Sequence, residues 1–304
     1  MSGAPQVVVV GAACRDLVDD DPRGWRLGGG ASYSALALAR LGLRVGALVV
    51  ADDLAADSDE LNMVRAAGVD VRVVPNTRGP IFINIETPTG RIQQTPQVSD
   101  PVPTDALPAD WRSASAWMFA PVAAEVPEAW ADIPARGALV ALGWQGLLRV
   151  LVAGSAVTHL PPGAHAVVRR ADLVGVGSDD VDDATTPAHL AAFMHEGATL
   201  AFTDGIHGGT AYTVGATPDQ LAARHWHSIP IEKYVDPVGA GDTFLAGVFA
   251  AQVKPEIAAS WTGPDPDLRM GAACGSLILE GPGLYGVPYL EDAVRRMHGG
   301  DNPD

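Results

Sequence analysis

The chain has 304 residues, 47% of them apolar, so it can bury a large core, and its 36 acidic and 20 basic residues give a formal net charge of −16. This charge, without any basic run, argues against nucleic acid or an anionic membrane as a partner, because neutralising phosphates takes clustered Lys and Arg. The two cysteines, the absence of an 18-residue apolar run and an N-terminus unlike a signal peptide predict a cytoplasmic protein without a membrane span.

Apolar strands and helices alternate along the first quarter of the chain. The run 7–10 is all valine, which is typical of a strand covered on both faces. A helix rich in Ala and Leu is expected at 31–41, where Gly42 follows as a helix-ending glycine. Next come a strand at 45–50, a helix at 57–67 and a strand at 69–74.

The segment 78–103 breaks this rhythm. Ile81, Ile83 and Ile85 alternate with other residues, a turn is expected at 87–90, and no helix follows. The pattern predicts a β-hairpin. We interpret it as a small lid or flap beside the main sheet; an ordinary edge hairpin is the alternative.

The alternation then resumes and continues to the C-terminal region. Further strands are expected at 116–119, 139–142, 173–176, 199–203, 212–214 and 225–229, and further helices at 127–133, 187–195, 242–252, 266–279 and 290–297. Together the elements predict a single α/β domain, with a mostly parallel sheet covered by helices on both faces and a small β-flap at about 78–103.

The most informative segment is Val235-Asp236-Pro237-Val238-Gly239-Ala240-Gly241-Asp242-Thr243-Phe244. Three small residues, Gly239, Ala240 and Gly241, open an apolar helix, and their N–H groups and the helix dipole can hold an anion. Asp242 follows in the first turn, where it can accept a proton from an attacking hydroxyl while the amides hold a phosphoryl group. The alternative is a tight turn with a carboxylate that complements the helix dipole.

This segment resembles the C-terminal signature of the ribokinase-like (PfkB) carbohydrate kinases, with Pro237 in place of the usual Thr. The N-terminal region is similar to the family's first signature: Gly11 precedes Asp16, and Gly28 and Gly29 open the helix that ends at Ala39-Arg40-Leu41-Gly42. The resemblance covers nearly the whole chain, with both signatures in the right order. It implies the ribokinase-like fold and transfer of the γ-phosphate of ATP to a hydroxyl of a small sugar or polyol.

The resemblance also implies roles for individual residues. The catalytic group comprises Asp242 as base, with Gly239, Ala240 and Gly241 as the anion hole. The remaining assignments are substrate binding by Asp16, Gly28, Gly29 and Gly30, contact with Mg²⁺ or a monovalent cation by Asp180 and Asp236, and nucleotide binding by Thr203, Gly205, Gly208, Gly271 and Cys274.

The sequence departs from the family pattern at two positions. Tyr33 stands where ribokinases carry Asn, which argues against ribose, and Gly177 stands for an Asn of the magnesium motif. Asp180 still suits Mg²⁺, which takes few protein ligands and keeps several waters. Stretches such as Gly11–Asp16 and Leu27–Tyr33 resemble those of inositol kinases, and the eleven residues between Asp16 and Gly28 leave room only for very short lid strands, if any.

Several other residues have two possible roles each. Gln145 and Arg149 follow a strand end, where α/β sheets bind ligands, so we place Gln145 at the substrate pocket; a surface loop is the alternative. Tyr33 is placed at the same pocket by its position in the family's first signature. Glu125 could likewise face a ligand or lie in a surface loop. Cys14 is expected to be a small core residue. His225 and His227 lack a third metal ligand in pattern and are expected on a solvated strand face.

Two rival functions remain open at this point. One is a nucleoside or vitamin kinase on the same fold, and the other is a sugar- or nucleotide-binding protein that has lost turnover. The chain is expected to be a monomer or homodimer with a small-molecule substrate.

Overall fold

The computed structural model describes residues 4–87 and 90–299. Its main sheet has nine strands in the order β16-β15-β14-β13-β9-β8-β1-β4-β5. The parallel strands are β1 (Val7–Ala12), β4 (Val45–Val50), β5 (Asp70–Val73), β8 (Ala116–Ala120), β9 (Leu139–Gly143), β13 (Leu173–Gly177) and β14 (Thr199–Thr203). Antiparallel β15 (Gly209–Val214) and β16 (Leu221–Trp226) extend one edge. The predicted α/β fold with a mostly parallel sheet is confirmed.

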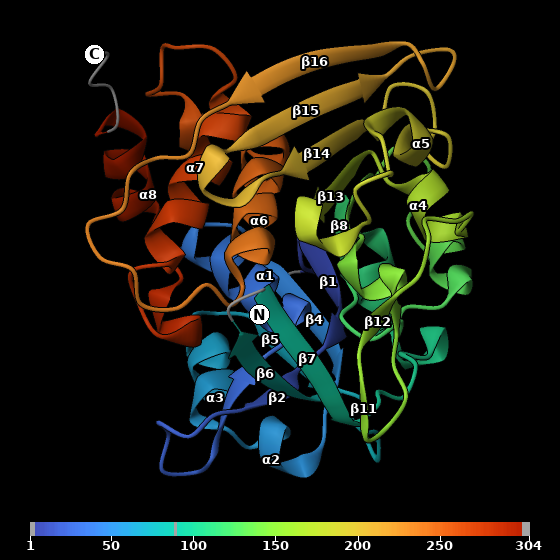
Figure 1. The fold of residues 1–304 in the computed structure, drawn as a ribbon, viewed down its shortest axis with the longest axis vertical. Helices are drawn as coiled ribbons and strands as arrows, with labels where there is room; N and C mark the ends of the chain where they lie inside the picture. The colour runs from blue at the N-terminus through green and yellow to red at the C-terminus, as the bar shows by residue number, and fades with distance from the viewer. Residues whose placement is uncertain (1–3, 88–89, 300–304) are drawn as a thin grey trace.

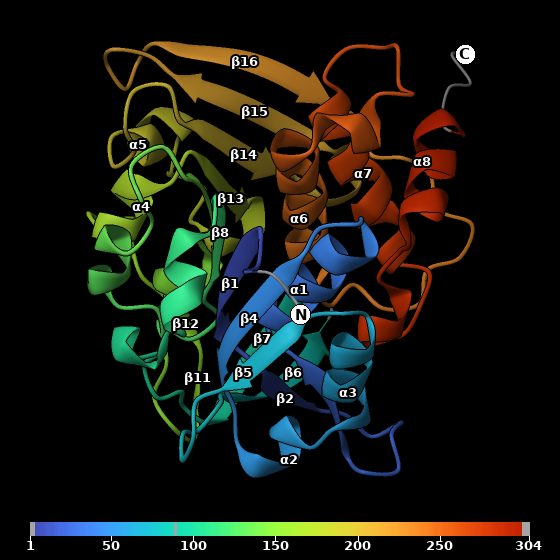
Figure 2. The ribbon, with the colours of Figure 1, turned by 180° about the vertical axis from the view of Figure 1, so that it is seen from behind.

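Helices cover both faces of this sheet, as Figures 1 and 2 show from opposite sides. One face carries α1 (Gly30–Arg40), α3 (Asp59–Ala66), α6 (Ala240–Val253) and α7 (Pro266–Ile278), with α8 (Leu290–His298) beside α7. The other face carries α4 (Ala166–Arg170), α5 (Pro187–Ala191) and several short 3₁₀ turns. Because both faces are covered, all six residues of β1 are buried, which explains its run of four valines.

A second sheet of five strands lies against one end of the first, in the order β11-β7-β6-β2-β3. Its strands are β2 (Cys14–Leu17), β3 (Trp25–Gly28), β6 (Ile81–Thr87), β7 (Gly90–Gln97) and β11 (Ser155–Ala156). The hairpin at 78–103 is therefore confirmed, although residues 88 and 89 of its expected turn lie outside the described residues. The hairpin is only part of the sheet: the very short β2 and β3 lie beside β6, and β11 comes from a distant loop.

Some expected elements have other bounds or another form. The helix expected at 127–133 is a 3₁₀ turn, Glu128–Asp132, held between Pro127 and Pro134, which limit a longer helix. The helix expected at 57–67 is the shorter α3, because the Ser58 side chain accepts from the Leu61 N–H and fixes its start. The strand expected at 225–229 lies earlier, as β16. Among the described residues, no helix has both the length and the apolarity to cross a membrane.

Candidate active site

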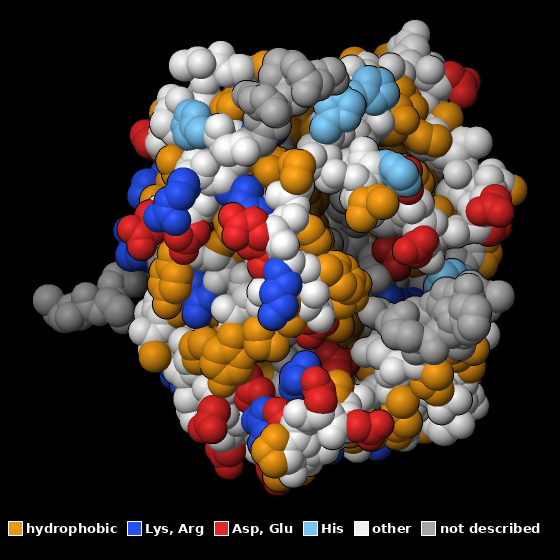
Figure 3. Space-filling model, turned by 60° about the vertical axis from the view of Figure 1, so that its left-hand side comes forward, with side chains coloured by type: hydrophobic (Ala, Val, Ile, Leu, Met, Phe, Trp, Pro, Cys, Tyr) orange, Lys and Arg blue, Asp and Glu red, His pale blue; other side chains and the backbone are white. Residues whose placement is uncertain are grey.

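A polar cavity of about 210 Å³ lies between the carboxyl ends of the central strands and the second sheet. In Figure 3 one face of the molecule is hollowed, with acidic side chains along the hollow. Ligands bind at this end of open parallel sheets. The predicted site residues on its wall are Asp16, Gly29, Gly30, Tyr33, Gln145, Asp180, Thr203, Gly239, Ala240, Gly241 and Asp242. Residues from both ends of the chain thus meet at one place.

Residues 237–241, at the start of α6, include the predicted anion site, and we call them the anion-binding turn. Gly239 is the N-cap of α6 and is left-handed, with φ of 80°, and Ala240 is the first helical residue. A Cβ atom on Gly241 would meet nothing within 4 Å, so its backbone is open toward the cavity. Inside this turn the Ala240 N–H donates to the Pro237 carbonyl at 3.2 Å. All five residues of the turn line the cavity, so the positive end of the α6 dipole lies at the cavity wall, as an anion site requires.

Asp242 lies in the first turn of α6, at the point where α1 also begins. A Cβ atom on Gly30 would lie 2.8 Å from Oδ1 of Asp242, so the carboxylate lies directly against the start of α1. Two helix N-termini therefore converge on this carboxylate, and only a residue without a side chain fits at position 30.

The electrostatics of Asp242 suit a proton acceptor. Burial raises the pKa of its carboxyl from 3.8 to about 7; Arg149 acts against this rise, whereas Asp180 and Glu125 add to it. The side chain still borders the cavity, so a substrate can reach it. A carboxyl with this pKa takes up and releases a proton near neutral pH, as a general base must.

Asp16 lies across the cavity from the anion-binding turn, on β2, and is 7% exposed. Its carboxylate lies against Gly28: a Cβ atom there would meet Oδ2 of Asp16 at 2.1 Å. Gly28 is thus required behind Asp16, although it is not itself part of the cavity wall. Gly29, with φ of 98°, is the N-cap of α1, and a Cβ atom there would meet the carbonyl oxygen of Ala12 at 2.2 Å. Both glycines let β3 pass into α1 beside the pocket.

Asp180, Gln145 and Arg149 form a connected group on the opposite wall. Gln145 Nε2 donates to Oδ1 of Asp180 over 2.7 Å, and Arg149 Nη2 lies 3.8 Å from the same oxygen. Oδ2 of Asp180 accepts from the Gly177 N–H at 3.1 Å. Burial lowers the pKa of the Arg149 guanidinium, while Asp180 acts to raise it. The Gln145 amide is thus held on the cavity wall by a carboxylate, as expected of a ligand-facing side chain.

Tyr33 and Asp236 make contacts within the protein that the sequence did not reveal. Tyr33 is 2% exposed, and a Cβ atom on Gly239 would meet its ring at 2.4 Å, so the ring supports the anion-binding turn. Its hydroxyl lies on the side of Gly283, where a Cβ atom on that glycine would lie 3.5 Å from it. Asp236 is not on the cavity wall; its Oδ1 accepts from the Val238 N–H at 2.9 Å and its Oδ2 from the Gly283 N–H at 3.1 Å. Tyr33 lines the cavity with its ring against the turn, and its contact with a substrate stays a prediction.

Comparison with known proteins agrees with this geometry. Residues 167–289 match the model of the pfkB family carbohydrate kinases. A fructokinase of Salmonella thompson is 30% identical over 79 residues, which are 26% of this chain and 35% of that protein, and one of Salmonella typhimurium is 30% identical over 25% of its length. The match thus spans about a third or less of these curated relatives.

Solved structures of the ribokinase family share the whole fold. A pyrophosphate-dependent kinase of this family, complexed with a pyrophosphate analogue and myo-inositol, has a TM-score of 0.70 at 18% identity, over 94% of this chain and 98% of that one. Ribokinase of Arabidopsis thaliana, complexed with ribose and ATP, has a TM-score of 0.66 at 16% identity, over 97% and 99%. At these identities the likeness shows a common fold.

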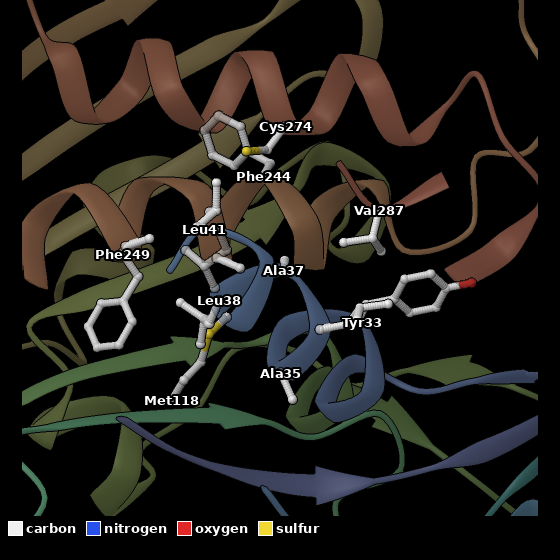
Figure 4. Packing of buried hydrophobic residues seen from close by; sticks show 14 of the residues in the cluster. Tyr33, Ala35, Ala37, Leu38, Leu41, Met118, Phe244, Phe249, Cys274 and Val287 are labelled. Carbon is white, nitrogen blue, oxygen red and sulfur yellow. The ribbon is translucent and has the colours of Figure 1, made fainter. Parts of the chain in front are cut away.

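The pfkB resemblance also predicted nucleotide binding by three glycines and one cysteine that do not line the cavity. Gly205 and Gly208 form the turn after β14, with φ of 48° and 87°, beside Thr203, which does line the cavity. Their contact with a nucleotide stays a prediction. Cys274 is fully buried between α7 and α6 (Figure 4), and its Sγ lies 3.9 Å from the sulfur of Met270.

Cys274 therefore cannot touch a nucleotide, and this part of the prediction is wrong. A Cβ atom on Gly271 would meet Val248 at 2.4 Å and Phe244 at 3.0 Å, so Gly271 serves the close approach of α7 to α6. The sequence pattern of small residues on α7 reflects helix packing at both positions.

The second sheet contributes wall residues that the pfkB signatures do not include. Asn84 of β6 and Gln93 of β7 line the cavity, and Gln93 Nε2 donates to the Asn84 Oδ1 over 2.8 Å. Phe82, 2% exposed, lies beside them. The alternation of the hairpin separates these residues from the isoleucines, and this is the signal that could have revealed them.

Cys14 and Glu125 are both buried beside the site. Cys14 lines the cavity, but burial and then Asp16 raise the pKa of its thiol well above the usual value, so it is not a thiolate nucleophile. Glu125 is 1% exposed, and its carboxylate accepts from the N–H groups of Val122 and Ala123, so it stabilises a turn rather than binding a ligand.

Proposed function

We propose that this protein is a kinase that transfers the γ-phosphoryl group of ATP to a hydroxyl of a small sugar or polyol. The observation that carries the proposal is the position of Asp242: a carboxylate with a pKa of about 7 lies in the cavity, beside the anion-binding turn of the same helix end. A carboxylate alone would repel phosphate there. Its presence is explained if it takes a proton while the amides hold the phosphoryl group.

The acceptor would lie between Asp16 and the anion-binding turn, under the second sheet as a lid. Carboxylate and amide side chains on the cavity wall, from Asp16, Asn84, Gln93 and Gln145, provide hydrogen-bonding partners for several hydroxyls. Tyr33 adds an apolar ring but no polar atom to this side. Such a wall suits a polyhydroxylated ring.

In the transfer step, Asp242 accepts the proton of the attacking hydroxyl as its oxygen bonds to the γ-phosphorus. The bond from that phosphorus to the β–γ bridging oxygen breaks, and ADP leaves. The N–H groups of Gly239 and Gly241 and the positive end of the α6 dipole stabilise the charge on the transferred group, while the Ala240 N–H donates to the Pro237 carbonyl. Catalysis of this reaction is mainly positioning and charge stabilisation, so this set of groups is sufficient.

Mg²⁺ would be held by Asp180 and the donor phosphates. Asp180 is a carboxylate on the cavity wall, and Mg²⁺ in kinases is bound by one or two carboxylates and several waters. When bound, Mg²⁺ neutralises the charge of the donor phosphates. Asp180 lies on the cavity wall, where the donor phosphates would bring negative charge beside the Arg149 guanidinium. Its contacts with Gln145 and the Gly177 N–H each leave lone pairs free, so the residues present fit the ion.

Relatives guide the choice of substrates to test. The structural relatives include one described with ribose and ATP and one with myo-inositol and a pyrophosphate analogue, and the curated relatives are fructokinases. The patches similar to inositol kinases and the Tyr33 ring favour an inositol-like acceptor over ribose in this chain.

The test is donor consumption with a panel of acceptors and Mg²⁺. ATP and pyrophosphate are each offered with myo-inositol, fructose, ribose and a set of nucleosides, and phosphorylated products are identified by mass spectrometry. We expect turnover with ATP and a sugar or polyol. Turnover with nucleosides alone assigns a nucleoside kinase, and normal ligand binding without any turnover assigns a binding protein; either result refutes the proposal.

A further inference from the structure

Asp236 holds the anion-binding turn from behind. Its Oδ1 accepts from the Val238 N–H at 2.9 Å, inside the turn, and its Oδ2 accepts from the Gly283 N–H at 3.1 Å, in the segment after α7. The side chain is 15% exposed. Both oxygens are therefore committed to backbone groups on two sides, and the carboxylate fixes the turn against the C-terminal part of the chain.

A half-buried carboxylate needs a compensating charge. Arg26 supplies one: its Nη1 lies 3.8 Å from Oδ2 of Asp236, and its Nη2 donates to Asp20 over 2.7 Å. Arg26 lies on β3, directly opposite Asp16 on β2. The guanidinium thus connects the second sheet, which carries Asp16, to the turn that carries the anion-binding amides.

The family resemblance assigns a cation to Asp236, and the residues present do not fit one. A metal ion on Asp236 would stand beside the Arg26 guanidinium, so the two positive charges would repel. Asp236 is not on the cavity wall, so no donor phosphate would offset that repulsion.

We infer that Arg26 supplies from within the chain the positive charge that a monovalent cation would bring to Asp236, and that it holds the anion-binding turn in place without such an ion. Arg26 is then a positioning residue: it acts through Asp236 and touches neither phosphate nor acceptor. The protein should accordingly be indifferent to the kind of monovalent salt.

The test compares melting temperatures in potassium, sodium and tetramethylammonium chloride at equal ionic strength. For the wild type we expect the same melting temperature, within about 1 °C, in all three salts. For Arg26→Gln we expect a loss of about 2 to 4 °C in tetramethylammonium, at least half of it recovered in potassium or sodium, because the freed carboxylate can then bind a small cation.

Two variants serve as controls. Arg72→Gln removes an exposed ion pair with Asp70 on β5, far from the turn, and should respond equally to the three salts. In the background of Asp236→Asn, the Arg26→Gln change should no longer lower the melting temperature or create a salt response, because the charge that it compensates is gone.

Selective stabilisation of the wild type by potassium or sodium would overturn the inference, as would an Arg26→Gln variant that melts like the wild type or equally in all salts. The effect of Arg26 on turnover depends on the proposed kinase activity. Melting does not require turnover, so a failure of the kinase proposal and a failure of the Arg26 assignment give different results.

Discussion

The first residue of α1, Gly30, lies against the carboxylate of Asp242: a Cβ atom on Gly30 would lie 2.8 Å from Oδ1 of Asp242 and 2.9 Å from the carbonyl oxygen of Ala120. The signature near the N-terminus and the one near the C-terminus thus meet at one carboxylate. The glycine is required because the second signature brings a charged side chain to its surface.

Gly30→Ala should therefore displace Asp242 and lower kcat by about 10- to 100-fold, since misplacing a catalytic group by about 1 Å can cost a factor of this size. The clash with backbone at Ala120 should also lower stability, by about 1 to 3 kcal/mol. Steady-state kinetics and thermal melting measure the two effects. Gly163→Ala is the matched control, since a Cβ atom there would meet nothing within 4 Å; equal kinetics for the two variants would contradict the contact.

The rate should depend on the ionisation of Asp242. Because burial raises the pKa of this carboxyl to about 7 and the base must be ionised, kcat/KM should rise about tenfold per pH unit below pH 7 and level off above it. A pH–rate profile from pH 5.5 to 9 measures this. A flat profile over that range would show that Asp242 is ionised throughout or is not the base.

The melting temperature provides an independent control for the same pKa. The folded-state pKa lies above the value of 3.8 expected in the unfolded chain, so the stability due to the neutral carboxyl is complete below pH 4 and is lost as the pH rises through about 7. Asp242→Asn lacks this loss. The difference in melting temperature between Asp242→Asn and the wild type should therefore grow in favour of the variant between pH 5 and pH 8.

Arg149 should influence the pH at which the kcat/KM profile reaches its midpoint. Its guanidinium acts to lower the pKa of Asp242. Arg149→Met keeps an unbranched side chain but removes the charge, so the midpoint of kcat/KM should move to higher pH. The measurement is the pH–rate profile of the variant beside that of Arg170→Met, which removes an arginine that interacts with Asp172 at the other end of the sheet. A midpoint at the wild-type position would contradict the electrostatic role of Arg149.

Two substitutions of Tyr33 should distinguish the role of its ring from the role of its hydroxyl. Tyr33→Phe should keep kcat and KM within about two-fold, because the hydroxyl lies near Gly283, in the segment after α7. Tyr33→Ala removes the ring under Gly239 and should cost about 3 to 5 kcal/mol of stability together with most of the activity. Steady-state kinetics and chemical unfolding test both; a raised KM for Tyr33→Phe would restore the hydroxyl to the substrate site.

The sequence was sufficient to predict the main sheet and the two signatures, because period and composition are local: the four successive valines of β1, for example, signal a doubly covered strand. It was insufficient where the placement depends on distant contacts. The strands β2, β3 and β11 have two to four residues each and no periodic pattern of their own. They are strands because β2 and β11 pair with the hairpin and β3 pairs with β2.

The site residues show the same division. Asp16 and Asp242 were placed at the pocket by strand ends and helix starts, and both line it. Cys274 was misplaced, because the small residues on α7 serve packing against α6. Asp236 was reassigned, because its partners Gly283 and Arg26 are distant in sequence. No local pattern reveals such partners.

The central claim is that Asp242 takes the proton of the attacking hydroxyl. The most direct measurement is kcat of Asp242→Asn with the acceptor that supports wild-type turnover, together with donor affinity by calorimetry. We predict a loss in kcat of at least about 10²-fold with donor affinity retained or improved, because the change removes only a negative charge and a proton acceptor. Turnover within a few-fold of the wild type would contradict the assignment of Asp242 as the base and, with it, the proposed mechanism.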